Sequence, residues 1–476
     1  MASLNDSFLI ARSGILTHQE RMAVISHNIA NINTPGYHRQ RALLGTNPPN
    51  EPNLFTSRNY AIGTGVRVMD IVRTYDETME RQYLNLNSSM EAQSSLSNAL
   101  GGVEGLLNST VDGVSLTDCL SKFWAAWQDV ATNPSNIAMR NVLLERSATL
   151  TGAIESVATN LDDYGEQVIN GTGPYTGAIA TVVGDINDLA TKIQNLNNRI
   201  TLAEAQKVNA NDLLDQRNTC IRDLSAKAGI TIDVDQTIMI NGQILVSGDG
   251  VTRNGLTIAA TPPPQFTLAG NPVTISGGEL DGYVQIADIV STFRTQLDTF
   301  SIELMSQVNA LHTAGYDLAG NAGVDFFTGT GAGDIQINAA LYNAANPLLN
   351  SPELVAASSS LNPGPPLGPN VGDGSNALKI ADLASVSMLA LGNRKLGSFL
   401  TDMTAAVGAR KAAAAALATD DQTALDAYAN AMQATDGVVL DDELLDMMSA
   451  QRAFEASSRV ATTINAMLDT IINRMG

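Results

Sequence analysis

The sequence is short of the residues from which most catalytic and metal-binding sites are made. Its 476 residues include two cysteines and four histidines, and only 5% are aromatic. Cys119 and Cys220 stand too far apart for the spacing of a metal site or of a redox motif. None of the histidines belongs to an HExxH pair of the kind that holds zinc. We therefore expect neither an enzyme nor a bound metal or other cofactor.

Basic residues and long apolar runs are also scarce. The chain has 27 lysines and arginines against 48 aspartates and glutamates, which gives a formal net charge of −21. Because an acidic surface repels phosphate backbones, nucleic acid is not an expected partner. No stretch approaches the roughly 20 apolar residues of a membrane span. The N-terminus lacks a basic segment followed by an apolar core, so we expect no ordinary secretory signal.

Two stretches imitate ligand-binding loops without meeting their requirements. The glycines between Gly329 and Gly333 follow no strand and open no helix, as a phosphate-binding loop would require. Residues 317–328 begin like a calcium loop. However, Ala322 stands where the turn glycine belongs, and Thr328 stands where the bidentate glutamate belongs. Neither stretch is therefore assigned a ligand.

Both ends of the chain carry a heptad pattern of apolar residues. Spacings that alternate between four and three are typical of a helix that buries one narrow stripe against another helix. Neither stripe has a partner next to it in the sequence, so we expect the two ends to pair with each other, with neighbouring chains, or both. This pattern favours an assembly subunit over an enzyme. The residues predicted to form subunit interfaces are Leu4, Phe8, Ile15, Met22, Ile25 and Ile29 near the N-terminus, and Leu444, Met447, Phe454, Ile464, Leu468, Ile471, Ile472 and Met475 near the C-terminus.

Between the two ends, the pattern changes from helical to strand-like and back. Residues 76–228 carry apolar stripes with helical spacing, and helix is predicted again from Ile286. Between these helices, short alternating apolar runs surround Asn241-Gly242, a pair that favours the positive φ angles of a hairpin turn. A later stretch, 313–375, is rich in glycine, alanine, asparagine, serine and proline and is predicted to be irregular.

Together these patterns predict a mainly α fold with a small inserted β domain. We expect long, paired, coiled-coil-like helices at the N- and C-terminal ends, a helical-bundle body, and a β insertion that faces outward. The predicted domains are a terminal helical core domain (1–39 and 440–476), a body (40–228 and 284–439, with the irregular segment 313–375), and the β domain (229–283).

Motifs at both ends resemble those of the bacterial flagellar axial proteins, which include the rod, hook and hook-associated proteins. The segment from His27 to Tyr37 resembles their N-terminal signature, although the family more often has asparagine at the first of these positions. The C-terminal run, with Gln451-Arg452-Ala453-Phe454, resembles their C-terminal segment. The signature residues carried over are Asn28, Asn31, Asn33, Thr34, Pro35, Gly36 and Tyr37.

Motifs in the middle of the chain narrow this resemblance to the flagellar hook-associated protein 1 family. The run Asn-Asp-Leu-Leu-Asp-Gln-Arg at 211–217 resembles one that is typical of this family, as do the stretches at 277–282, 308–317 and 372–378. A hook or rod subunit would share both ends but would lack the run at 211–217. A hook or distal rod protein remains the alternative.

The resemblance implies a non-enzymatic structural subunit of the extracellular flagellum, located at the junction between hook and filament and without a cofactor. It implies export in an unfolded state through the flagellar type III channel, followed by assembly through the terminal helices. The implied partners are copies of the same chain in a ring, the hook subunit, a second junction protein with flagellin beyond it, and a cytosolic export chaperone on the C-terminal helix. No membrane span and no nucleic acid are implied.

Overall fold

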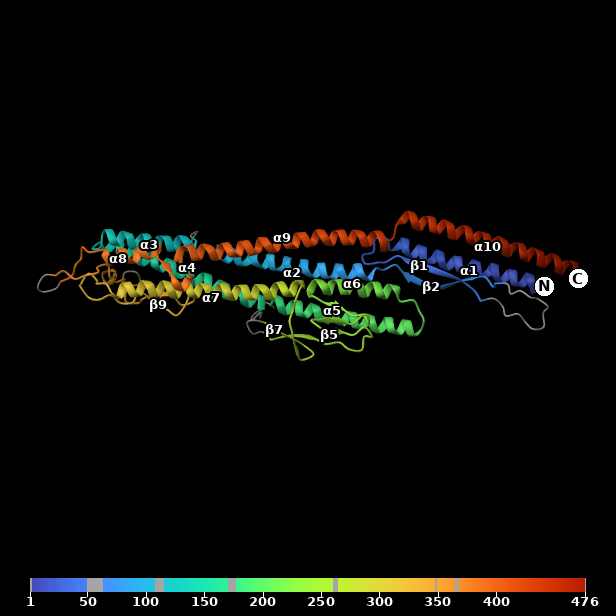
Figure 1. Cartoon of the computed structure of the whole chain (residues 1–476), viewed down its shortest axis with the longest axis horizontal. Coiled ribbons are helices and arrows are strands. Elements are labelled where there is room, and N and C mark those ends of the chain that lie inside the picture. Colours follow the sequence, from blue (N-terminus) through green and yellow to red (C-terminus); the bar gives the residue numbers. More distant parts are fainter. Residues whose placement is uncertain are drawn as a thin grey trace.

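The computed structural model describes residues 2–48, 63–107, 115–169, 177–259, 264–346, 349–363 and 368–475. The chain forms a long, narrow rod in which the long helices run lengthwise and both termini lie at the same end (Figure 1). The predicted fold class is confirmed: the protein is mainly α, with small sheets and long paired terminal helices. No helix among the described residues combines the length and apolarity that crossing a membrane requires.

The first and last helices, α1 (Ala2–Ala30) and α10 (Leu440–Met475), lie side by side and run in opposite directions (Figure 1). Gly14 lies in their contact, where a Cβ atom would stand 2.7 Å from the Oγ atom of Ser457. The absence of a side chain at Gly14 therefore permits the close approach of the two helices. Of the arrangements that the heptad pattern left open, the structure contains the pairing of the two ends within one chain.

Helix α1 is followed by a turn that contains Thr34-Pro35-Gly36. The Thr34 N–H donates to the Asn31 carbonyl (2.9 Å), and the Tyr37 N–H donates to the Thr34 carbonyl (3.2 Å). Gly36 adopts a φ of +77°, which glycine tolerates without strain. The chain then forms an antiparallel ribbon that lies along α1 and consists of β1 (Gln40–Thr46) and β2 (Val66–Arg73).

The body is a bundle in which α2 packs against α9, α7 and α6, and α7 also packs against α4. Helix α9 spans 41 residues and buries apolar side chains such as Leu400, Met403 and Val407 at heptad spacing. The body helices are α2 (Glu77–Leu107), α3 (Leu116–Thr132), α4 (Ile137–Ile169), α5 (Ala178–Ala205), α6 (Asn211–Lys227), α7 (Gly278–Thr313), α8 (Ser375–Asp382) and α9 (Leu396–Asp436).

Between α6 and α7 the chain forms two small antiparallel sheets, which lie against one side of the body beside α5 (Figure 1). The predicted hairpin is confirmed: Asn241 and Gly242, with φ angles of +47° and +76°, join two paired strands. The first sheet contains β3 (Thr231–Ile232), β4 (Ile238–Ile240) and β5 (Gln243–Val246), and the second contains β6 (Leu256–Ala259), β7 (Gln265–Leu268) and β8 (Asn271–Val273).

Side chains on α5 hold both sheets against the body. The Asn187 side chain donates to the Leu256 carbonyl and accepts from the Leu256 N–H, each at 2.8 Å.

Helix α7 begins at Gly278, a few residues before the predicted end of the β domain at 283. Asp281 fixes this earlier start, because its carboxylate accepts a hydrogen bond from the backbone N–H just ahead of the helix (2.9 Å).

The stretch predicted to be irregular lies at the end of the rod opposite the termini, against α3, α4 and α7 (Figure 1). It consists of loops and short elements whose backbone is held by many local hydrogen bonds. The short elements at this end are β9 (Phe327–Thr328), β10 (Gln336–Ile337), η2 (Pro352–Leu354), η3 (Leu383–Ser385), β11 (Ser387–Met388), η4 (Leu389–Leu391) and β12 (Arg394–Lys395).

His312 joins the irregular stretch to the helical body. It is fully buried near the end of α7, with its ring packed between Trp127 and Phe326. Its Nδ1 atom bonds to the Val324 carbonyl, and its Nε2 atom accepts from the Ala356 N–H (2.9 Å), so the ring is neutral and donates through Nδ1. Burial lowers the pKa of His312 to about 4, although the bond to the Val324 carbonyl opposes this shift.

The stability of this end of the rod should therefore depend on pH. Because the pKa of His312 is about 4 in the folded chain and 6.5 when unperturbed, the unfolded chain binds the extra proton first as the pH falls. The contribution of His312 should be complete above pH 6.5 and disappear as the pH falls to 4, a loss of about 3 kcal/mol at about 1.4 kcal/mol per pKa unit.

Urea unfolding followed by tryptophan fluorescence at several pH values would measure this loss, because both tryptophans lie in α3 and Trp127 packs against His312. The variant His312→Gln should lose stability at pH 7 but show a weaker decline between pH 6.5 and 4. The matched control, His27→Gln, changes an exposed ring and should keep the wild-type decline. An unchanged pH dependence in His312→Gln would contradict this assignment.

Candidate assembly interface

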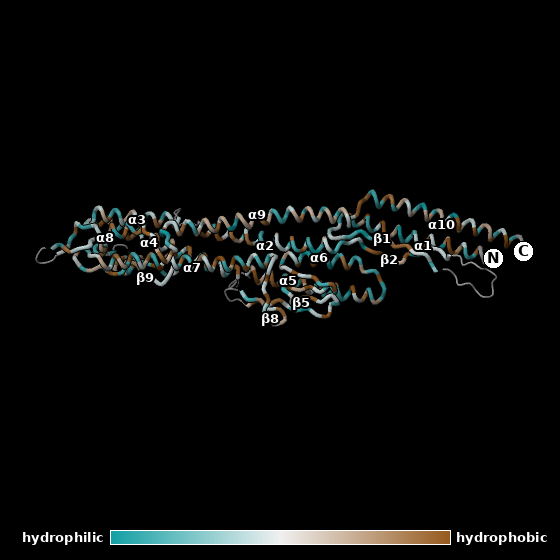
Figure 2. Tube along the Cα trace, viewed as in Figure 1, coloured by the Kyte–Doolittle hydropathy of each residue, from teal (hydrophilic) through white to brown (hydrophobic). Residues whose placement is uncertain are grey.

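One face of α10 packs against α1 with the spacing of a coiled coil. Ala450 and Ile464 are buried on this face, and the positions between them are half-buried. Figure 2 shows hydrophobic residues recurring along both helices out toward the termini. This face consists of Glu443, Met447, Ala450, Phe454, Ser457, Ala461, Ile464, Leu468 and Ile471, which alternate in steps of four and three.

The structure separates the predicted interface residues into two groups. On α1, Ile25 is buried. On α10, Leu444 and Ile472 are 46% and 65% exposed and lie outside the face that meets α1. Met475 ends α10, and its side chain lies outside the described part of the chain. The remaining predicted residues are partly or fully covered within the single chain: Leu4, Phe8, Ile15, Met22 and Ile29 are half-buried, as are Met447, Phe454, Leu468 and Ile471, while Ile464 is buried.

A second group of apolar side chains on α10 remains largely exposed within the chain. Each of them is between 44% and 65% exposed. Isolated exposed apolar residues are ordinary, but a series of them along one helix marks a surface for association. We call this series the outer row; it consists of Leu440, Leu444, Leu445, Met448, Val460, Met467 and Ile472.

Where the terminal helix pair meets the body, a buried polar cluster fastens the two parts together; we call it the joint. Asn28, which is 1% exposed, stands at its centre and makes four hydrogen bonds. Its amide nitrogen donates to the Gln40 carbonyl (2.8 Å) and to the Glu443 carboxylate (3.0 Å). Its amide oxygen accepts from the Gln40 N–H (3.0 Å) and the Tyr37 hydroxyl (2.8 Å). The hydrogen-bonding capacity of this side chain is therefore fully used.

The carboxylate of Glu443 is buried at the start of α10, and it is neutralised from the N-terminal side of the chain. Arg39 donates to it through Nε (2.6 Å) and also contacts Asp446 (3.3 Å). Arg21 pairs with the other oxygen of Asp446 (3.0 Å). Because Glu443 lies in the first turn of α10, the helix dipole also favours its charge. These contacts fix α10 relative to α1 and to the chain that follows α1.

The body contributes Asp215 of α6 to the joint. This buried carboxylate accepts from the His38 backbone N–H (3.1 Å), and its other oxygen bonds to the His38 ring (2.7 Å) and the Arg73 guanidinium (2.9 Å). Gln40 reaches the same helix, because its side chain donates to Asp212 (2.8 Å). The N-terminal signature and the run at 211–217, which lie far apart in the sequence, therefore form one bonded unit.

The remaining signature residues shape the loop that carries these contacts. Asn31 and Thr34 bond to each other at the end of α1 (3.1 Å), and a Cβ atom at Gly36 would lie 2.5 Å from the hydroxyl of Thr219. Asn33 and Pro35 are exposed. Burial raises the pKa of Tyr37, and the nearby carboxylates, Asp212 foremost, raise it further, so this phenol stays protonated as a donor.

Sequence reasoning missed the charged members of the joint. Asp441 and Asp442, which precede Glu443 in α10, are exposed, whereas Glu443 itself carries the buried charge. A signal was present, because Glu443 continues the heptad seam at a position where a charge is unfavourable unless it is paired. No similar signal pointed to Arg73 or Arg39, whose partners lie far along the chain.

A hollow of about 680 Å³ opens beside the joint, between α1, the ribbon and the corner that joins α5 to α6. Its walls include Val24, Ile71 and Leu213, with Arg199 at the rim. Within the described ranges, no group of three or more histidine, cysteine or acidic side chains is placed to hold a metal ion.

Three family models match successive parts of the chain. The helical domain of the flagellar hook-associated protein FlgK matches residues 100–327. The flagella basal body rod protein model matches residues 8–38, and the C-terminal model of the flagellar basal body rod proteins FlgEFG matches residues 429–475. The ends and the middle therefore match models that all come from flagellar proteins.

Curated relatives carry the name flagellar hook-associated protein 1. The protein of Bacillus subtilis (strain 168) is 24% identical, over 98% of this chain and 97% of that protein. The protein of Salmonella typhimurium (strain LT2) is 28% identical over 67% of this chain, and the match spans only 58% of that longer relative. The solved structure of the flagellar hook junction protein FlgK from Burkholderia pseudomallei has the same fold, with a TM-score of 0.60 and 14% identity, over 74% of this chain and 99% of that one.

Because Asn28 stands at the centre of the joint, we expect its replacement to destabilise the terminal helix pair. In Asn28→Leu, the buried backbone N–H and carbonyl of Gln40 lose this partner, and the Glu443 carboxylate and the Tyr37 hydroxyl each lose one hydrogen bond. The terminal helix pair should lose about 3 kcal/mol or more, because each unsatisfied buried polar group costs about 1–3 kcal/mol. Hydrogen exchange should accelerate through α1 and α10.

The matched control is Asn33→Leu, which changes an exposed asparagine in the same loop and should leave exchange unaltered. The unfolding transition reported by tryptophan fluorescence should have its midpoint at the same urea concentration in both variants, because both tryptophans lie at the other end of the rod. Equal exchange rates in Asn28→Leu and Asn33→Leu would show that the joint does not hold the helix pair.

Proposed function

The chain belongs to the flagellar hook-associated protein 1 family, and from this membership we propose that it is the structural subunit that forms the junction between the hook and the filament of the bacterial flagellum. It acts outside the cell as part of the flagellum. The relatives bear the names of hook-associated proteins, and we assign the chain no enzymatic role. The observation that carries this proposal is the rod that presents both chain ends together as one rigidly fastened helix pair.

Assembly takes place through this helix pair. The seam between α1 and α10 buries apolar side chains within one chain, whereas the side chains of the outer row remain largely exposed. Burial of the outer row against neighbouring copies contributes about 25 cal/mol for each Å² of apolar surface. Because the joint fixes the direction of the pair, a contact made along α10 also sets the orientation of the body. The predicted interface residues thus have two roles: those on the seam order the pair, and Leu444 and Ile472 meet neighbours.

The partners that we propose follow from a position between two parts of the flagellum. They are further copies of the chain in a ring, the hook subunit on one side, and a second junction protein with flagellin on the other. Export takes place through the flagellar type III channel in an unfolded state. An export chaperone in the cytosol binds the α10 segment, and the apolar content of that segment supports this assignment, since both its seam and its outer row are uncovered before folding.

Another axial subunit, a hook or distal rod protein, is the alternative, because such proteins match the same end segments. The junction is favoured because the match to the helical domain includes α6, and α6 supplies Asp212 and Asp215 to the joint. In this chain the attachment of the terminal helices therefore depends on residues of the run that distinguishes the family.

Substitutions on the two faces of α10 separate pairing within the chain from contact between chains. The double variant Leu444→Asp, Ile472→Asp changes only exposed positions, so the purified chain should fold with wild-type stability. In cells that lack the native gene, this variant should be exported but fail to complete the junction, because charges would be buried without partners between subunits. Flagellin should then leak into the medium and motility should be lost.

Immunoblots of the medium for this chain and for flagellin, together with electron microscopy of hooks, measure the two steps separately. Thr463→Asp, at an exposed polar position of α10, is the control and should assemble normally. In contrast, Ile464→Asp should destabilise the α1–α10 pair already in the purified chain, by several kcal/mol. Normal filaments in cells that carry the double variant would contradict the proposal that the outer row joins subunits.

A further inference from the structure

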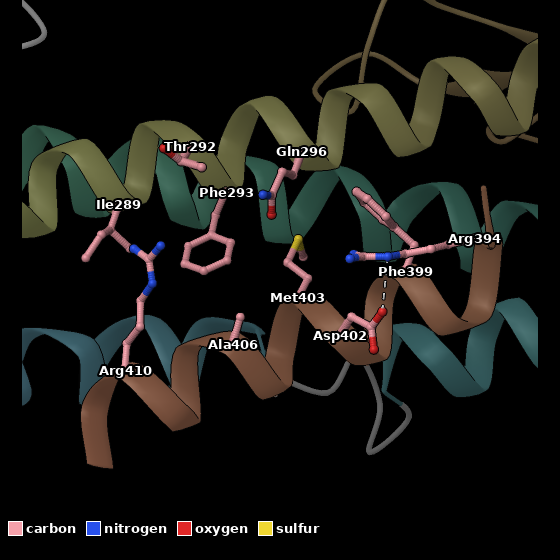
Figure 3. A pocket seen from close by; sticks show the side chains of 10 residues that line it. All are labelled: Ile289, Thr292, Phe293, Gln296, Arg394, Phe399, Asp402, Met403, Ala406 and Arg410. Carbon is pink, nitrogen blue, oxygen red and sulfur yellow. Dashed lines mark ion pairs between the residues drawn. The ribbon is translucent and has the colours of Figure 1, made fainter. Parts of the chain in front are cut away.

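A small hollow of about 110 Å³ lies between α7 and the beginning of α9, at a distance from the joint (Figures 1 and 3). Its floor is apolar, because Ile289, Phe293 and Met403 are buried there. Phe399 and Ala406 extend this apolar surface along α9. The hollow exceeds the roughly 30 Å³ that one water molecule occupies in the liquid, so it has room for a branched apolar side chain.

Two arginines stand at opposite ends of this hollow. Figure 3 shows Arg394 and Arg410 on either side of the apolar side chains, with Arg394 beside Asp402. The Arg394–Asp402 pair is 3.5 Å long and more than half exposed, so solvent screens it strongly. Among the residues that the structure describes, Arg410 has no salt-bridge partner. The hollow is therefore an apolar slot with an excess of positive charge, on a chain whose net charge is −21.

A complementary shape exists elsewhere on the same chain, at the turn between β3 and β4. Val234 stands at the tip of this turn with 79% of its surface exposed, between the exposed carboxylates of Asp233 and Asp235. No salt bridge within the described residues involves either aspartate. The turn thus presents one branched apolar side chain between two negative charges.

The turn is held in one shape before any contact is made. The Asp233 carboxylate accepts from the Val234 N–H (2.7 Å), and the Asp233 N–H donates to the Thr237 carbonyl (3.0 Å). Gln236 closes the turn onto the Asp233 carbonyl (2.9 Å) and accepts through its side chain from Arg217 of α6 (3.1 Å). A fixed turn loses little conformational entropy on binding.

We propose that the turn at 233–235 of one copy inserts Val234 into the α7–α9 hollow of a neighbouring copy, with its two aspartates facing Arg394 and Arg410. This inference rests on the proposed function, which brings copies of the chain side by side. The turn follows α6, whereas the hollow lies where α9 begins, so the two surfaces are separate on one chain (Figure 1).

Because the two surfaces differ, each copy offers its turn to one neighbour and its hollow to the next. Such a head-to-tail contact repeats around a ring, whereas a self-complementary contact closes as a dimer. Charge complementarity favours a second copy of the chain as the occupant of the hollow, because the turn carries two negative charges and the hollow carries the excess positive charge. The contact joins the bodies of neighbouring subunits, in addition to the contact between their terminal helices.

Cysteine cross-linking in assembled flagella tests this contact directly. The full-length chain would carry Val234→Cys and Ala406→Cys in a background with Cys119→Ala and Cys220→Ser. Flagella purified from cells that make this variant would be oxidised mildly and analysed without reducing agent. A head-to-tail contact should give a ladder of dimers, trimers and longer products. Val234→Cys alone and Ala406→Cys alone should give none, and cells that make both single variants should give dimers only.

Charge exchange tests whether the arginines face the aspartates. In the two-cysteine chain, Arg394→Glu with Arg410→Glu should reduce cross-linking about tenfold. Asp235→Arg, which leaves the Asp233 carboxylate that holds the turn, should reduce it as well. Combining Asp235→Arg with either Arg394→Glu or Arg410→Glu should restore most of the cross-linking in one of the two combinations, the one that exchanges a facing pair. Arg146→Glu, at an exposed arginine on α4, is the control and should leave cross-linking unchanged. Circular dichroism of each purified chain would confirm that the variants fold.

Intact filaments that yield no ladder from the two-cysteine chain would overturn the contact and leave the proposed function standing. A cross-link from Val234→Cys to another flagellar protein would likewise overturn the choice of a second copy. Failure of the proposed function looks different: the cysteine-free background, although folded and present, would then be missing from the junction between hook and filament. Failure of both charge-exchange combinations to recover cross-linking would overturn the assignment of the charge pairs.

Discussion

The hydrogen bond between Asn28 and Glu443 is the contact on which the arrangement of this rod depends. The terminal helix pair continues into the body through the loop and ribbon that follow α1 and through the short stretch between α9 and α10. Neither connection could fix a direction without tertiary contacts. Burial of an unpaired carboxylate is strongly unfavourable. Here Asn28, Arg39 and the start of α10 all stabilise the charge of Glu443. Because Asn28 also binds the Gln40 backbone, the same side chain connects α1, the ribbon and α10.

The joint gives a physical reason for the division of α10 into two faces. One face is covered by α1, so the helix pair is ordered before it meets a neighbour, which lowers the entropy lost on assembly. The other face keeps the outer row available for association. A single helix thus serves both the fold of one chain and the contact between chains. The polar joint fixes the position of α10 relative to α1 and so determines which face of α10 is covered, because a buried polar cluster tolerates few alternative arrangements.

The strongly acidic composition limits how such rods can lie side by side. Copies that each carry a charge of −21 repel one another, and salt screens this repulsion beyond about 10 Å. Close contact therefore requires either apolar burial, as the outer row offers, or local charge complementarity. The slot between Arg394 and Arg410, together with the turn at Val234, provides both in one place. In this view the charge keeps the free chain soluble, and a few matched surfaces determine where it associates.

The sequence by itself determined the periodic features of this protein. The heptad spacing established long helices at both ends, the Asn241-Gly242 pair established a hairpin, and the motifs at 27–37 and 211–217 identified the family, because each of these signals is local. The tertiary structure alone decided what each stripe faces. Spacing shows that one side of α10 is buried but not which helix covers it, so the row that contains Leu444 and Ile472 was assigned an interface together with residues that meet α1. The joint could not be predicted from the sequence for the same reason. Asn28 and Glu443 stand 415 residues apart, and a hydrogen bond between them does not alter the local sequence pattern around either residue.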